Sequence, residues 1–228
     1  AYQTTPAPSF NCSLTVDELR EGFKMVKEST ASSPGGLHYG IWKTLITNET
    51  AFEPFALMIM FAFRWSVVPV MWEKVVQIIL AKDVGQKTKI TRIRRVQLLD
   101  AGLNMGFRIL FGHRMLQAAK KLGVLSDLQF GARSGYMCIS CVLLKRLSYD
   151  IIRQLRSTAI AFDKDAKACY DRMIPSIGVI LARGVGVEKS VTTTLANTTK
   201  RMKFHVKTAF GVSPGCFTTT PTVAILGL

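Results

Sequence analysis

Residues 159–175, AIAFDKDAKACYDRMIP, constrain the fold most, because a short apolar run leads directly into clustered carboxylates. A run of this length ended by polar residues is typical of a buried strand. Alternation along a strand places Asp163 and Asp165 on one face, and Asp171 follows. Carboxylates at a strand end, beside lysines, suit a divalent cation that also contacts a phosphate. The alternative is a polar strand-to-helix turn, with Asp171 or Ser176 as a helix cap.

The charge balance indicates a polyanionic partner. Thirty Lys and Arg oppose fifteen Asp and Glu, which gives a formal net charge of +15 in 228 residues. Such an excess favours nucleic acid and predicts strongly salt-dependent binding. An anionic membrane surface or a solubilising role is the alternative explanation.

The cysteines and the apolar runs indicate an intracellular protein of the cytoplasm or nucleus. Five cysteines, an odd number, occur without an evident secretory signal. The pair Cys138 and Cys141 forms a lone CxxC in an apolar stretch, which favours core packing over zinc binding. The longest apolar run, residues 55–63, is too short to span a bilayer, so we expect no membrane insertion.

Hydrophobic periodicity predicts a helix-rich chain with a few strands. Residues 15–18 form a capping box that opens the first helix. The basic residues 82–95, between apolar segments, predict a hairpin or loop that presents cations. We expect helices at residues 15–28, 37–45, 52–65, 103–122, 138–155, 175–183 and 188–199, a turn at 69–72, and strands at 75–81 and 203–210.

Ordered sequence blocks resemble the reverse transcriptases of non-LTR retrotransposons, from about residue 32 to the end of the sequence. DAKACYD is similar to the family's first catalytic motif, D-x-x-K-A-F-D, and GVSPG is similar to its later G-V-x-Q-G block. The blocks are SPGG (33–36) with GIWK (40–43), PVMW (69–72), IILAK (78–82), RRVQL (94–98), LQFGAR (128–133), DAKACYD (165–171), and GVSPG (211–215) with TP (220–221).

This resemblance implies an α+β fold, a partial right-hand polymerase. The fingers and the upstream palm would be helix-rich, with a small antiparallel sheet. Residues 1–30 would form a lead-in and helix, residues 31–157 the fingers with adjoining palm helices, and residues 158–228 a partial palm. The remaining palm and the thumb of the same polyprotein would complete the enzyme.

The resemblance also implies specific residue roles in an RNA-directed DNA polymerase. Asp165 would be the catalytic ligand of two Mg²⁺ ions, which clamp the in-line attack of a primer 3′-hydroxyl on a dNTP. Tyr170 would be the aromatic gate that selects deoxynucleotides, while Lys82 and Arg94 would contact the triphosphate. The positions implied to bind the RNA template and the DNA primer are Arg133, Gly211 and Gly215.

The chain also departs from the family pattern. Arg95 replaces a proline, and Pro214 replaces the glutamine of the later block and lacks its side-chain amide. The family's Tyr-x-Asp-Asp turn, which supplies further metal ligands, does not occur in the sequence. We therefore expect residues 1–228 alone to lack polymerase activity.

Two other functions remain open. The chain can be a non-catalytic basic module that binds RNA or DNA through residues 82–95 and 145–156. A metal-dependent nuclease built on Asp163 and Asp165 is a weaker alternative, because no supporting constellation accompanies the two carboxylates. The residues His38, His113 and His205 are scattered, which favours surface or packing roles.

Overall fold

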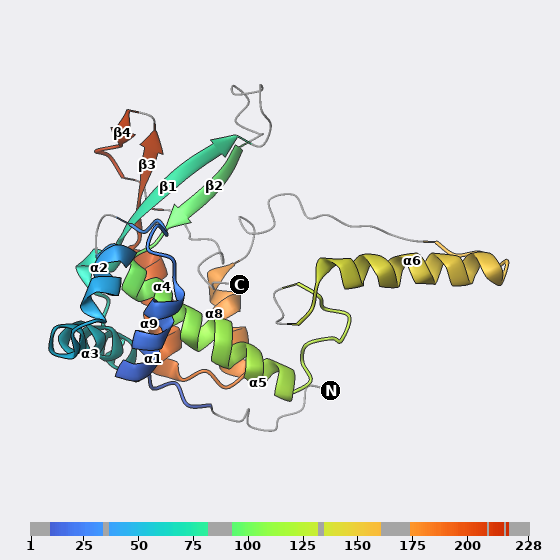
Figure 1. The fold of residues 1–228 in the computed structure, drawn as a ribbon, viewed down its shortest axis with the longest axis horizontal. Coiled ribbons are helices and arrows are strands. Elements are labelled where there is room, and N and C mark those ends of the chain that lie inside the picture. The colour runs from blue at the N-terminus through green and yellow to red at the C-terminus, as the bar shows by residue number, and fades with distance from the viewer. Residues whose placement is uncertain are drawn as a thin grey trace.

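A computed structural model of the chain describes residues 10–33, 37–81, 93–131, 135–160, 174–208, 210–216 and 218. Of residues 81, 93 and 94 only the backbone is described. The fold is α+β and helix-rich, with one small sheet at one end of the helices (Figure 1). The expected fold class is thus confirmed at this level.

Helix α1 (Val16–Met25) begins at the predicted capping box. The Thr15 hydroxyl accepts the backbone N–H of Glu18, and the Glu18 carboxylate accepts the backbone N–H of Thr15. These two bonds satisfy N–H groups that a helix start leaves unpaired. Leu19 and Phe23 lie on the buried face, as their spacing predicts.

The next elements follow the predicted order closely. The predicted turn contains a short 3₁₀ helix, and the predicted strand after it is present. The elements are α2 (Tyr39–Leu45), α3 (Glu49–Trp65), η1 (Val70–Trp72), β1 (Lys74–Ala81) and β2 (Ile93–Leu98).

The long helix predicted at residues 103–122 is present but changes its hydrogen-bonding pattern midway. It runs through α4 (Ala101–Phe107), the π-helical segment η3 (Arg108–Met115) and α5 (Leu116–Lys121). Gly123, at φ 66°, ends it in the left-handed conformation that glycine adopts without a Cβ penalty. The widened π turns still place Leu110 and Phe111 in the core.

The C-terminal half adds helices and two strands that complete the sheet. Predicted helices at residues 138–155, 175–183 and 188–199 are confirmed within a few residues. The elements are α6 (Cys138–Gln154), α8 (Pro175–Gly184), α9 (Lys189–Arg201), β3 (Lys203–Thr208) and β4 (Gly211–Val212).

The sheet has the order β2-β1-β3-β4 and is mixed. β1 pairs antiparallel with β2, and β3 with β4, but β1 and β3 are parallel. The expectation of an antiparallel sheet is therefore wrong for the central pair. A parallel pair needs a long crossover, and the chain from β2 through α9 provides one.

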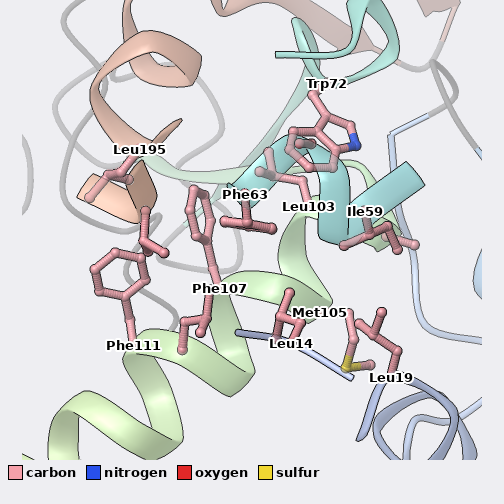
Figure 2. Close-up of a cluster of buried hydrophobic side chains, with 14 of the residues drawn as sticks. Leu14, Leu19, Ile59, Phe63, Trp72, Leu103, Met105, Phe107, Phe111 and Leu195 are labelled. Carbon is pink, nitrogen blue, oxygen red and sulfur yellow. The ribbon is translucent and has the colours of Figure 1, made fainter. Parts of the chain in front are cut away.

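An aromatic core joins the base of the sheet to the helices. Figure 2 shows Phe63, Phe107 and Phe111 beside Leu195 of α9. The Phe63 ring lies 5.5 Å from that of Phe107 and 5.6 Å from that of Trp72, centroid to centroid. Offset and edge-to-face pairs of this kind stabilise a core beyond the area they bury.

Helix α6 lies apart from this core (Figure 1) and has no buried residue. Cys138 and Cys141 are both exposed. Their predicted core packing is wrong, because α6 contributes nothing to the buried cluster. Among the described residues, no helix is long and apolar enough to cross a membrane.

Candidate nucleic-acid interface

Most residues that the sequence singled out lie outside the described part of the chain. These are Lys82, Arg133, Asp163, Asp165, Tyr170 and Asp171. Ala159 and Ile160, at the start of the predicted acidic strand, are described and have no regular secondary structure. The predicted magnesium site therefore stays a prediction.

Arg94, Gly211 and Gly215 can be placed. Arg94 lies in β2 with its backbone opposite Leu80 of β1. Gly211 begins β4 opposite Thr208, and its φ of 124° is a conformation that side chains disfavour. Gly215 follows β4, where its carbonyl accepts the Ser213 hydroxyl. The backbones of Arg94 and Gly211 lie in β2 and β4, the two edge strands of the sheet.

The strands between those edges carry a row of cations that the motifs did not predict. The register pairs Lys74 of β1 with Lys203 of β3, and Lys207 with Ile78. Residues two apart on a strand share a face, and registered neighbours do too. Lys74, Lys203, His205 and Lys207 therefore share one face, which we term the basic sheet face.

The opposite face of these strands packs against the helices. Val75 and Phe204 form a registered pair, and both are almost fully buried in the core. The three lysines of the basic sheet face, on the other side, are exposed, although Val76 beside His205 on that face is only 1% exposed. The register thus fixes which side the cations occupy.

A buried carboxylate holds one end of the basic sheet face. Glu73, just before β1, lies 3.0 Å from the guanidinium of Arg201 and 3.5 Å from the ammonium of Lys203. The backbone N–H of Lys203 donates to the Glu73 carbonyl at 2.7 Å. Glu73 neutralises part of the local charge, so Lys203 is held more rigidly but attracts an anion less strongly.

The turn after β4 contacts the middle of β3 through Ser213. The His205 Nδ1 atom lies 3.2 Å from the Ser213 carbonyl oxygen, so this nitrogen carries the proton. The Ser213 hydroxyl accepts the backbone N–H of Val206. His205, half-buried in β3, is thus a packing residue, in agreement with one of the roles the sequence favoured.

No family model matches the chain, and no curated protein matches it.

Of the cations predicted to form a surface on α6, two lie on one side of the helix. Arg146 and Arg153 are seven residues apart and lie on one side of the helix. Arg153 lies 3.9 Å from Asp150, and the Lys145 ammonium lies 5.9 Å from the centre of the Tyr149 ring. Sequence reasoning emphasised this region and residues 82–95, where cations are dense. The period-two pattern of Lys203, His205 and Lys207 was used to predict a strand, but its cations were not recognised as a binding surface.

The residues around one hollow in the described chain hold the segment before α1 in place. A hollow of about 570 Å³ lies beside Arg114 and Lys121. The Arg114 guanidinium donates to the carbonyls of Asn11 and Ser13 and to the Glu18 carboxylate. Arg114 thereby fastens the segment before α1 to η3. Within the described ranges, no group of three His, Cys, Asp or Glu residues is placed to hold a metal ion.

Proposed function

We propose that the chain binds the phosphate backbone of nucleic acid through the basic sheet face, as the fingers and partial palm of an RNA-directed DNA polymerase. The observation that carries the binding proposal is the shared, solvent-facing side of Lys74, Lys203 and Lys207. Lysines are mobile point charges, and such contacts supply affinity without reading sequence.

The polymerase part of the proposal is supported by the order of the family-like blocks. Two of them, at residues 94–98 and 211–215, occupy or adjoin the strands that flank the basic sheet face. A nucleic-acid strand on that face would run between these two blocks. Asp165 would bind Mg²⁺, and further carboxylates must complete a two-metal site.

Charge removal on the basic sheet face tests the binding proposal. The variant combines Lys74→Gln, Lys203→Gln and Lys207→Gln, and affinity for a labelled RNA–DNA hybrid is measured by fluorescence anisotropy at several salt concentrations. Each lost phosphate contact lowers the slope of log affinity against log salt by roughly 0.7–0.9. The expected slope decreases by about 2, since Lys203 shares its charge with Glu73.

A matched control removes the same net charge elsewhere. Lys24, Lys120 and Lys121 are exposed on α1 and α5, which lie away from the sheet (Figure 1). Changing all three to Gln should leave the salt slope nearly unchanged. Equal losses in the two triple variants would show that only net charge matters and would reject the proposed interface.

Activity separates a polymerase from a binding module. The chain is fused to a downstream segment that supplies a Tyr-x-Asp-Asp turn, and primer extension is measured with Mg²⁺ and dNTPs. A polymerase would extend the primer, and Asp165→Asn would abolish extension. A non-catalytic module would show no extension, and Asp165→Asn would leave binding unchanged or tighten it, because a negative charge is lost.

A further inference from the structure

The first turn of α6 carries two exposed thiols that the proposed function does not use. Cys138 is the first residue of α6, and Cys141 lies one turn later. Both are exposed and neither forms a disulfide. The exposed pair lies in a helix of 17 residues, so its spacing is set by regular helical geometry.

That spacing permits a direct bond between the two sulfurs. Residues three apart in an α-helix have Cα atoms about 5 Å apart and side chains about 60° apart around the axis. Disulfides join Cα atoms separated by roughly 4.4–6.8 Å. The Cβ atoms of such residues lie about 5–6 Å apart in a regular helix, against roughly 3.5–4.5 Å in a disulfide, so the first turn of α6 must tighten by about 1 Å to join the two thiols.

The pair stays accessible even if a partner covers the apolar stripe of α6. Leu143, Leu147 and Ile151, all more than half exposed, follow each other at four-residue spacing and define that stripe. At 100° per residue, Cys138 lies about 180° and Cys141 about 120° from the centre of the stripe at Leu147. Oxidants can thus reach both sulfurs whether or not a partner covers the stripe.

Two other cysteines of the chain lack this arrangement. Cys12 is 4% exposed, and its sulfur accepts the backbone N–H of Glu188. Burial raises the pKa of the Cys12 thiol, which disfavours the reactive thiolate. Cys216 is exposed in the turn region after β4 and has no cysteine within three residues in the sequence. Cys12 therefore serves as the reference for a buried thiol, and Cys216 as the reference for an exposed thiol without a neighbouring cysteine.

We propose that Cys138 and Cys141 form a reversible dithiol–disulfide couple that exchanges with small-molecule disulfides of the glutathione type. One protein thiolate attacks the small disulfide, breaks its S–S bond and releases one thiol. The second protein thiolate then attacks the mixed disulfide, forms the Cys138–Cys141 bond and releases the second thiol. Two electrons and two protons pass from the protein pair to the small molecule.

Mass spectrometry of the whole chain in glutathione redox buffers tests the couple. Trypsin cuts after Arg133 and Lys145, so one peptide contains Cys138 and Cys141 and no other cysteine. The expected product in this peptide is the loss of two hydrogen atoms. It should exceed glutathione adducts on the same peptide at least about tenfold, because the neighbouring thiol has a high effective concentration. Cys216 should carry the adduct instead.

A register variant provides the matched control. Ser140→Cys combined with Cys141→Ser keeps two cysteines in the turn but directs them about 160° apart, so an intact helix cannot join them. This variant should give only glutathione adducts, with helix content checked by circular dichroism. Equal closure in both proteins would overturn the proposal. So would adducts at Cys138 and Cys141 at the occupancy of Cys216, or a disulfide between two chains.

Discussion

Asp100 offers a sharp test of the fold's electrostatics. It is the N-cap of α4 and is only 2% exposed. One of its carboxylate oxygens accepts the backbone N–H groups of Gly102 at 2.8 Å and Leu103 at 3.1 Å. Burial raises the pKa of Asp100 from 3.8 to about 6, although these bonds and, more weakly, the Trp72 indole oppose the increase.

The direction of the pH effect follows from this pKa. Because the folded chain holds the Asp100 proton more tightly than the unfolded chain, folding is favoured most below pH 3.8. That contribution is lost as the pH rises through about 6. At 1.36 kcal/mol for each pH unit between the two pKa values, the ionised carboxylate costs about 3 kcal/mol at pH 7.

Asp100→Asn should remove this cost and keep the cap, because an amide oxygen can accept the same two N–H bonds. We expect the variant to be more stable than the wild type by roughly 1–3 kcal/mol at pH 7 and nearly equal to it below pH 4. The comparison cancels the titration of all other groups. Urea denaturation followed by circular dichroism at several pH values measures the difference.

Asp100→Ala is the control, because it removes the charge and the cap together. Loss of a cap costs about 1 kcal/mol, so this variant should be less stable than Asp100→Asn at every pH. A stability difference between Asp100→Asn and wild type that does not change between pH 4 and 7 would refute the reasoning. It would show that the folded and unfolded chains bind the proton equally.

Other substitutions test the packing and the caps, with the free energy of unfolding as the measurement. Thr15→Ala removes the capping box of α1 and should cost about 1 kcal/mol; an unchanged stability would contradict the role of that cap. Gly106→Ala places a Cβ 2.2 Å from the Phe63 ring and should cost roughly 1–3 kcal/mol through overpacking. Gly184→Ala meets nothing within 4 Å and should be neutral or stabilising by up to about 1 kcal/mol; a loss like that at Gly106 would contradict the packing argument.

Local sequence signals predicted most of the helices and strands. The Thr15 cap, the glycine at 123 and the β-branched run before residue 82 each act within a few residues of themselves, and the structure contains the corresponding helix start, helix end and strand. The π-helical segment within the long helix was not predicted. Its hydrogen bonds reach one residue further than those of an α-helix, and apolar spacing does not report that change.

Periodicity also predicts an apolar face without naming what packs against it. On α8, Ala182 packs into the core, whereas Ile177, Ile180 and Leu181 are at least half exposed. Cys141 of α6 belongs to a similarly apolar stretch and is exposed. Sequence reasoning assigned that stretch to the core because burial depends on tertiary neighbours that a local pattern does not contain.

The basic sheet face shows why register had to come from the structure. A slip of β3 by one residue would turn Lys203, His205 and Lys207 toward the helices, because strand side chains alternate. That arrangement would place a polar side chain in the buried position that Phe204 occupies, which is unfavourable. Burial of Phe204 and the contacts of Glu73 with Lys203 both act against the slip. The same interactions that stabilise the pairing of β1 and β3 therefore keep the cations on the solvent side.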